Sequence, residues 1–243
     1  MSSSAVRSLE TLLHHRKLGC TLPGLTAPPR IMATGLEAFD RAIGGGWRQG
    51  ALSEIVGPRS AGRTHLMLAT LAKATQQGQV VALVDALDRF DPNSAAEAGV
   101  DLDRVLWVRG IPVLAEQARP TVIDQAVKQA VRACDLILRA GGFAVVALDL
   151  RNIPVRRLQA LPSITWLRLA QVTETQETVG LLLGDAPIGR SARGVSVVLE
   201  GHTRWTGESA QSRRLAGFTP AWTIRSATGL SSSVHGAMAE AHG

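Results

Sequence analysis

The sequence contains no tyrosine, only two cysteines, and lysine at no more than three of its 243 positions. Cys20 lies before a proline-rich segment and Cys134 lies within a helical pattern, so we expect two reduced thiols and no disulfide. The six histidines form no pattern of metal ligands. A fold that depends on disulfides or structural zinc is therefore not expected.

Long apolar runs are also absent. No run reaches the length of a membrane span, and the N-terminus lacks the continuous apolar segment and the cleavage site of a signal peptide. These absences predict a cytoplasmic protein without membrane contact. Apolar residues nevertheless make up 45% of the chain, which excludes a disordered protein and, at this length, predicts one globular core.

The net charge is +6, and the basic residues are almost all arginine. A positive balance suits a partner that carries phosphates or an acidic surface. A codon bias toward arginine and alanine gives the same composition, so the charge alone does not identify the partner.

The chain divides into four segments. Residues 1–20 place apolar side chains at helical spacing, and this helix is a candidate for association with a partner or a second copy, or for packing on its own domain. Residues 21–33 are rich in proline and glycine and are expected to be a linker. Residues 34–226 form the predicted core domain. Residues 227–243, rich in serine, glycine and alanine, are expected to be disordered.

Short buried runs alternate with longer amphipathic ones in the core domain. The expected strands are 51–57, 81–86, 105–109, 143–150 and 179–185. The expected helices are 64–77, 93–98, 121–140 and 161–176. This alternation predicts an α/β fold with a mostly parallel β-sheet flanked by helices. Two later runs, VSVVLEG and GFTPAWTIRS, are expected to add antiparallel strands at one edge near the C-terminus.

The segment after the first core strand fits the phosphate-loop pattern G-x-x-x-x-G-K-[ST] at every position but one, because Arg63 stands where lysine is expected. In such loops the backbone N–H groups and the following helix N-terminus bind phosphate. The lysine reaches the outer phosphates, and the hydroxyl holds magnesium. Arg63 keeps the charge but not the compact ammonium group, which disfavours transfer of the outer phosphate. The predicted nucleotide-binding residues are Gly57, Pro58, Arg59, Ser60, Ala61, Gly62, Arg63, Thr64 and Asp149.

Asp149 ends the strand FAVVALDL, where a carboxylate could hold magnesium together with Thr64. The ordinary alternative is a strand-end aspartate that caps the next turn. The phosphate loop upstream, in the right order along the chain, favours the functional interpretation. ATP and Mg²⁺ are therefore the expected cofactors if the site has kept its activity.

The stretch TGLEAFDRAIGGGWRQGALSEIVGPRSAGRT is similar to the segment that leads into the phosphate loop of the RecA recombinase family. The similarity continues through VVALVDALDRFDPNSAAEAGVDLDRVLWVRG, and the order of strands follows the family to the tail. The resemblance implies a RecA-like P-loop core, for which ATP and single-stranded DNA are candidate ligands; self-association is a further candidate property, through the N-terminal helix.

Several positions depart from the family pattern. Leu87 stands where the family has the glutamate that activates water, and Asp88 could replace it only if the backbone shifted. Gly184 and Asp185 stand where the family has an Asn-Gln pair that senses the outer phosphate. The next DNA-binding loop is shortened to APIGRSARG, and no counterpart of the family's C-terminal domain is found. No catalytic residue is therefore predicted.

With these departures the chain resembles the ImuA family. That resemblance implies a role in SOS-regulated translesion DNA synthesis after DNA damage, in the cytoplasm and at the nucleoid when the protein is engaged on DNA. It implies as partners an inactive Y-family polymerase homologue, a replicative-type polymerase and RecA itself.

Arginines cluster on two loops expected at the carboxyl edge of the sheet. The candidate DNA-binding residues are Arg151, Arg156, Arg157, Arg190 and Arg193. Taken singly, each is more often a solvated surface arginine, but their shared position suits phosphate contacts with single-stranded DNA.

Three functions remain open from the sequence. The first is an accessory protein that binds partners, with ATP absent or bound and not hydrolysed. The second is an active DNA-dependent ATPase of the recombinase type. The third is an inhibitor that caps a filament of RecA or of a cell-division protein.

Overall fold

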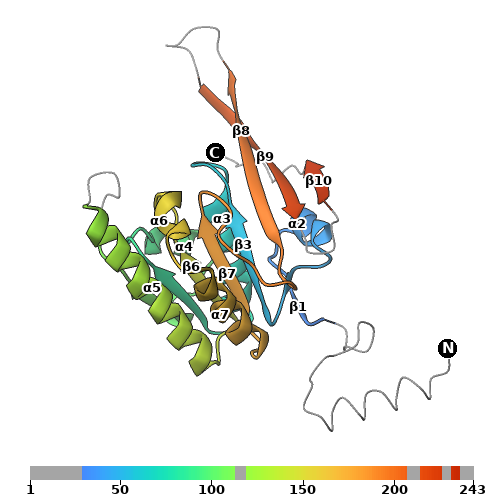
Figure 1. Cartoon of the computed structure of the whole chain (residues 1–243). Helices are drawn as coiled ribbons and strands as arrows, with labels where there is room; N and C mark the ends of the chain where they lie inside the picture. Colours follow the sequence, from blue (N-terminus) through green and yellow to red (C-terminus); the bar gives the residue numbers. More distant parts are fainter. Residues whose placement is uncertain (1–28, 113–118, 207–213, 226–230, 236–243) are drawn as a thin grey trace, which may run out of the picture. The chain divides into compact units, whose positions relative to one another are not determined.

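The computed structural model describes residues 29–112, 119–206, 214–225 and 231–235. The helix predicted within residues 1–20 and most of the predicted linker lie outside these ranges. In the described part of the chain, one eight-stranded sheet has the order β10-β9-β8-β3-β7-β6-β4-β5 (Figure 1). Its strands are β3 (Ala51–Val56), β4 (Val81–Asp85), β5 (Val105–Arg109), β6 (Val145–Asp149), β7 (Val179–Gly184), β8 (Ser196–Thr206), β9 (Arg214–Arg225) and β10 (Ser231–His235). β1 (Ile31–Met32) and β2 (Trp47–Arg48) pair separately.

The sheet is parallel through its centre and antiparallel at one edge. β3, β7, β6, β4 and β5 run parallel, and β8 is parallel to β3 over a short register. β9 and β10 then add antiparallel strands, which confirms the predicted mostly parallel sheet with antiparallel edge strands. The strand β10 lies inside the segment 227–243, where disorder was expected. Its SSSVH sequence has no apolar alternation to reveal a strand, and it is paired to β9 in backbone register.

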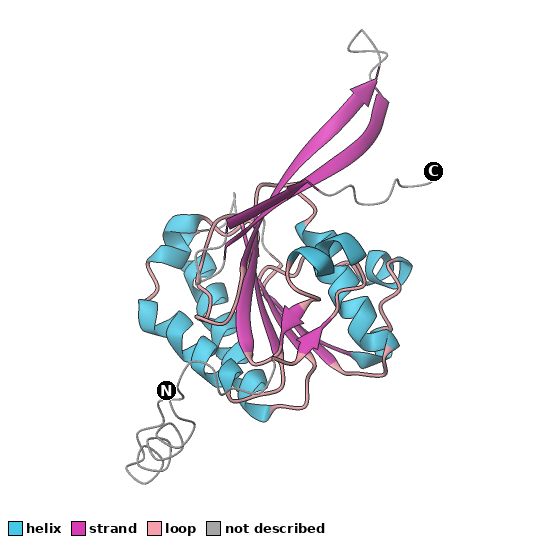
Figure 2. Ribbon diagram, turned by 90° about the vertical axis from the view of Figure 1, so that its right-hand side faces the viewer, coloured by secondary structure: helices cyan, strands magenta, loops and turns pink. Residues whose placement is uncertain are grey.

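Helices cover both faces of the sheet (Figure 2). They are α2 (Glu37–Ala42), α3 (Arg63–Gln76), α4 (Pro92–Glu97), α5 (Pro120–Ala140), α6 (Val155–Gln159) and α7 (Ser163–Glu174), with a 3₁₀ turn η1 (Leu102–Arg104). Side chains of α2, α3 and α4 share one apolar cluster with the sheet, and those of α5, α6 and α7 share the other. The helices expected at 64–77, 93–98, 121–140 and 161–176 therefore form, with small shifts at their ends.

The central strands are mostly apolar because both of their faces are covered. Every residue of β3, β4, β6 and β7 is buried. Neighbouring residues alternate between the two clusters, so that Leu83 packs on the side of α3 and Val84 on the side of α5. Helix α5 starts with a proline in its first turn, and its buried residues recur every three or four positions. These buried residues are Ile123, Ala126, Val127, Ala130, Cys134, Ile137 and Leu138.

The segment before β3 is fastened to the core by polar contacts. The Asp40 carboxylate accepts hydrogen bonds from the Thr34 backbone N–H at 2.8 Å and the Thr34 hydroxyl at 2.8 Å. Trp47, fully buried, packs on Phe39 with ring centroids 5.3 Å apart and donates to the Thr70 hydroxyl at 3.0 Å. The start of the domain is therefore joined to α3, the helix that follows the phosphate loop.

The parallel arrangement brings the carboxyl ends of β3, β4, β6 and β7 to one edge, where ligand sites of open α/β sheets lie. The loops that leave this edge are 57–62, 86–91, 150–154 and 185–195. All the predicted site residues are in or next to these loops. Within the described ranges, none of the helices has the length and apolar character needed to cross a membrane.

Candidate functional site

The phosphate loop connects β3 to α3 through a backbone that only small residues allow. Gly57 has φ +151°, and a Cβ placed there would lie 2.3 Å from the Leu199 carbonyl oxygen. Ser60 (φ +61°) and Gly62 (φ +93°) adopt left-handed conformations, and α3 begins at the next residue. The strand, curled loop and helix that a phosphate cradle requires are therefore all present.

The side chain of Arg63 is held inside the protein. It is 5% exposed, and its Nη1 donates to the Gly184 carbonyl oxygen at 2.7 Å and to the Asp185 carboxylate. Two departures from the family pattern thus form one ion pair between the start of α3 and the end of β7. A buried charge of this kind needs its partner, so Arg63 is fixed on Asp185.

A second arginine occupies the neighbouring polar positions. The Arg151 guanidinium donates from Nε to both Asp149 carboxylate oxygens, at 2.8 and 3.0 Å, and from Nη1 to the Thr64 hydroxyl. Its Nη2 and its backbone N–H also donate to Asp149. The side chains of Arg151 and Asp149 are 13% and 4% exposed. One guanidinium thus bridges the two groups that were expected to hold magnesium.

The charged groups next to this bridge shift one another's pKa values. Asp85 ends β4 directly beside Asp149 in the sheet register. Burial raises the pKa of Asp85, and the nearby Asp149 carboxylate acts in the same direction. Burial alone would lower the pKa of Arg151, but the carboxylates around it, Asp149 first and then Asp85 and Asp185, together raise it. Arg151 therefore stays charged and neutralises Asp149.

Magnesium does not fit these residues as they are arranged. A P-loop metal is held by the hydroxyl of the loop and by the strand-end carboxylate, and both already bind Arg151. Among the described residues, no group of three or more histidines, cysteines, aspartates or glutamates is placed to hold a metal ion.

The position where the family has its catalytic glutamate is occupied by a buried leucine. Leu87 is 3% exposed and packs in the cluster beneath α5. Asp88 (φ +54°) accepts hydrogen bonds from Arg109 Nε at 2.9 Å and Nη2 at 2.8 Å, and Arg109 lies 4.6 Å from the centre of the Trp107 ring. The hydrogen bonds from Arg109 hold the pKa of Asp88 below its usual value, which weakens it as a base.

The five candidate DNA-binding arginines lie in different settings. Arg156 and Arg193 are exposed. Arg157 pairs with Asp124 of α5 at 3.2 Å, and Arg190 donates to the Ser191 carbonyl oxygen at 3.4 Å. Arg151 is turned to the phosphate loop. Direct DNA contact stays a prediction for this group, and the exposed pair is best placed for it.

The loop after β7 is fastened to β3 by residues that were not among the predicted site residues. The buried Glu54 carboxylate accepts from the backbone N–H groups of Ile188 at 2.8 Å and Gly189 at 3.0 Å. The Ser191 backbone N–H donates to the Leu52 carbonyl oxygen at 2.9 Å. A glutamate in the middle of a fully buried strand is the signal that could have identified this anchor.

Comparison with known proteins agrees with this geometry. The family model of the RecA N-terminal domain matches residues 26–150. The chain is 34% identical over 124 residues to Protein RecA of Leifsonia xyli subsp. xyli, which is 51% of this chain and 31% of that protein. For Protein RecA of Chlorobaculum parvum the identity is 36% over 121 residues (49% and 31%), and for that of Methylococcus capsulatus 38% over 120 residues (49% and 30%). The matched region thus spans 31% or less of these three relatives.

Proposed function

As the chain belongs to the RecA N-terminal domain family, we propose that it is an accessory protein of the bacterial DNA-damage response that does not turn over ATP. Its role is in translesion DNA synthesis, where it binds partner proteins and single-stranded DNA. The partners implied by the ImuA resemblance are an inactive Y-family polymerase homologue, a replicative-type polymerase and RecA. It acts in the cytoplasm, and at the nucleoid when engaged on DNA.

One observation carries this proposal: the phosphate cradle keeps its backbone while the groups for turnover are engaged elsewhere. Arg63 is bound to Asp185, and Leu87 fills the position of the base. Arg151 bridges Thr64 and Asp149. A recombinase fold that lacks free groups for turnover suits a protein that acts by binding partners and not by hydrolysing ATP.

Contact with single-stranded DNA is supported by the net charge of +6 and by the exposed Arg156 and Arg193 near one edge of the sheet. Such contacts go to phosphates and carry no base specificity. Binding should therefore weaken steeply as salt increases and should not depend on base sequence.

The decisive experiment measures phosphate release from ATP in Mg²⁺, with and without single-stranded DNA. We expect a rate no higher than the buffer blank in both conditions, with the RecA protein of Methylococcus capsulatus as the positive control. Robust release stimulated by DNA would overturn the proposal and favour the ATPase alternative.

Restoring the family residues should not restore turnover. We expect the double variant Arg63→Lys, Leu87→Glu to release phosphate no faster than Arg63→Lys alone, because Arg151 still binds Thr64 and Asp149. Phosphate release under the same conditions measures this. A double variant that approaches the RecA control would show that Arg151 does not block the site.

The partners can be tested by affinity capture of the full chain from cells treated with a DNA-damaging agent. Recovery of polymerase components supports the accessory role. Recovery of RecA or a cell-division protein without a polymerase supports the filament-capping alternative, and recovery of none of them counts against both.

A further inference from the structure

We propose that the phosphate loop binds the polyphosphate of a nucleotide without a divalent cation, because Arg151 takes the place of the metal. The inference rests on the proposed function in that it concerns the same loop, but it makes a separate statement about the ligand. It follows from the mismatch between magnesium and the residues that were expected to hold it.

The guanidinium of Arg151 is built into the site by more than one ion pair. Asp149 receives hydrogen bonds from the backbone N–H, Nε and Nη2 of this one residue, which leaves its carboxylate directed at Arg151. The planar fork of arginine matches a carboxylate in this way, whereas an ammonium group would not.

The turn that carries Arg151 is also tied to its neighbours. Asn152, in the left-handed region at φ +62°, donates its backbone N–H to Asp185 at 3.3 Å. Its side-chain oxygen accepts from Arg59 Nε, within the phosphate loop, at 3.0 Å. The turn after β6 is therefore joined to the phosphate loop and to the end of β7. These two contacts, together with the hydrogen bonds to Asp149, fix the position of the guanidinium.

A metal would have to displace this side chain to reach its ligands. Displacement would break the side-chain hydrogen bonds between Arg151 and Asp149 and would leave the mostly buried guanidinium without its carboxylate. Conversely, a guanidinium already at this place offers positive charge and N–H donors to a phosphate, in addition to the backbone N–H groups of the loop. The ligand class is therefore a nucleoside diphosphate or triphosphate in its metal-free form.

Isothermal titration of the full chain with ADP and with ATPγS tests the inference, once in Mg²⁺ and once in EDTA. We expect the same dissociation constant in both buffers. Binding that weakens by about tenfold or more in EDTA, which is a loss of about 1.4 kcal/mol, would overturn the inference because it would show that a divalent cation contributes to binding. Absence of binding in both buffers would also overturn it, yet would leave the proposed role without turnover intact.

Variants separate the guanidinium from the loop. Arg151→Ala frees Thr64 and Asp149, so its nucleotide binding should become magnesium-dependent, while Arg41→Ala, at an exposed arginine of α2, should bind as the unaltered protein does. Thr64→Ala should change affinity equally in Mg²⁺ and in EDTA. If Arg151→Ala does not fold, as judged by circular dichroism, Thr64→Ala decides: a loss confined to Mg²⁺ would show that the hydroxyl binds metal.

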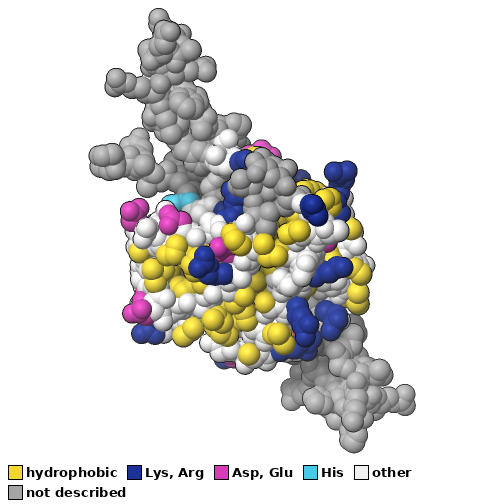
Figure 3. All heavy atoms as spheres, turned by 90° about the vertical axis from the view of Figure 1, so that its left-hand side faces the viewer, with side chains coloured by type: hydrophobic (Ala, Val, Ile, Leu, Met, Phe, Trp, Pro, Cys, Tyr) yellow, Lys and Arg dark blue, Asp and Glu magenta, His cyan; other side chains and the backbone are white. Residues whose placement is uncertain are grey.

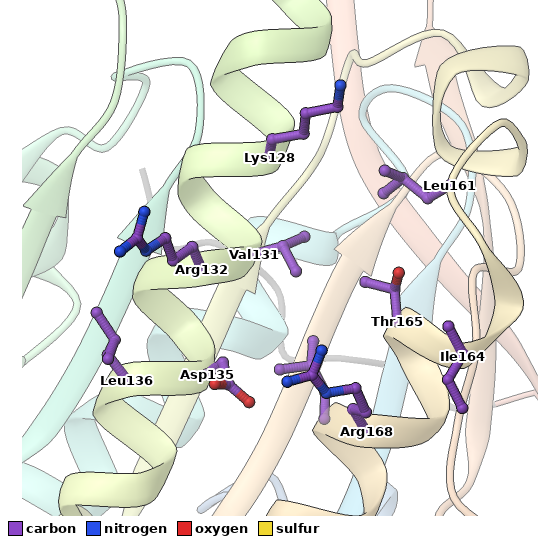
Figure 4. Close-up of a pocket in the computed structure, with 10 residues that line it drawn as sticks. Lys128, Val131, Arg132, Asp135, Leu136, Leu161, Ile164, Thr165 and Arg168 are labelled. Atoms are coloured by element: carbon purple, nitrogen blue, oxygen red, sulfur yellow. The ribbon is translucent and has the colours of Figure 1, made fainter.

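A different observation carries a second inference, on the opposite face of the sheet from α3. A groove of about 400 Å³ runs between α5 and α7, and Val131, Leu161 and Leu169 lie along it (Figure 4). Two large apolar side chains that line it are exposed to solvent, Leu136 at 59% and Ile164 at 54%, and Leu167 of α7 is exposed at 51%. The face seen from the side of α5 mixes such apolar side chains with lysine and arginine (Figure 3).

The charge of the groove indicates what it binds. Lys128, Arg132 and Arg168 line it, whereas its single acidic residue, Asp135, is bound to Arg139 at 2.8 Å. We propose that an acidic amphipathic helix of a partner protein docks here, with apolar side chains in the groove and carboxylates on the three cations. Residues 4–17 of the chain itself are a poorer match, because their charges are mostly basic. DNA is disfavoured because its backbone has no apolar groups to cover the exposed leucine and isoleucine side chains.

Fluorescence anisotropy tests this surface with a labelled synthetic amphipathic helix that has leucines on one face and glutamates on its flanks. We expect it to bind, and the same peptide with lysines for glutamates to bind at least about tenfold more weakly. The double variant Arg132→Glu, Arg168→Glu should reverse this preference, while Arg41→Glu should not. Failure of the acidic peptide to bind, equal binding of both peptides, or tight binding only of a peptide with residues 4–17 would each overturn the inference.

Discussion

At the scale of single residues, the site is defined by two arginines that bind carboxylates of the protein itself. Arg63 belongs to a loop that binds phosphate, but it is held by Asp185, a residue more than one hundred positions away. Arg151 lies two residues after Asp149 and binds back to it. Neither charge could be buried alone, so each arginine and its carboxylate depend on one another.

The Arg63–Asp185 pair has a measurable consequence for stability. Asp185→Ala leaves the buried Arg63 with the Gly184 carbonyl oxygen as its remaining acceptor, and we expect the free energy of unfolding to fall by about 2 kcal/mol. Urea denaturation measures this. Arg63→Met in the same chain removes the stranded charge and should recover most of the loss; two additive losses would show that the side chains do not interact.

Cys134 provides a test of burial. It is 2% exposed within α5, and desolvation raises the pKa of its thiol to about 12. In a Cys20→Ser background, the folded protein should therefore react with iodoacetamide at pH 8 far more slowly than the protein in urea. Because the folded pKa is raised, the contribution of this thiol to stability is complete below its ordinary pKa and is lost as pH rises toward 12. Equal reaction rates in the folded and denatured states would contradict the burial.

At the scale of elements, the sequence predicts most of the helices and strands but few of the polar contacts that join them. The strongest patterns are the apolar runs and the long amphipathic repeat over 121–140. The structure contains each element that they predict, namely β3, β4, β6, β7 and α5. Helices α2 and α6, with six and five residues, are too short to show a period. The glycines of the phosphate loop predict its backbone conformation, but they do not predict which groups the side chains of Arg63 and Arg151 contact. Those directions depend on carboxylates that come together only when the sheet forms.

The anchor between β3 and the loop after β7 can be tested by hydrogen exchange. Glu54→Ala removes the acceptor for the N–H groups of Ile188 and Gly189, so we expect these amides to exchange faster. The variant should also lose about 2 kcal/mol of stability, because two partly buried N–H donors lose their acceptor. Glu54→Gln keeps an oxygen in place and should retain most of the protection. Unchanged exchange in Glu54→Ala would contradict the anchoring role.

At the scale of the whole molecule, the core from Ile31 onward forms a compact unit of its own. Its two apolar clusters are both made by the sheet and its flanking helices. A chain that lacks residues 1–28 should therefore still unfold in one cooperative transition, with a melting temperature close to that of the full chain. Calorimetry measures this. If residues 1–20 also mediate association, sedimentation should show the shortened chain as a monomer; a shortened chain that aggregates or melts without a transition would show that the core needs the missing segment.

The pairing of Arg63 with Asp185 also limits how this protein can change over time. Arg63→Lys alone replaces a guanidinium whose Nη1 contacts both Gly184 and Asp185 with a compact ammonium group, and loss of Asp185 alone strands a cation in the interior. Either substitution alone should therefore give a less stable protein, whatever it adds to the chemistry of the loop. A lysine at position 63 thus comes at a cost in stability, although the backbone of the phosphate loop is unchanged.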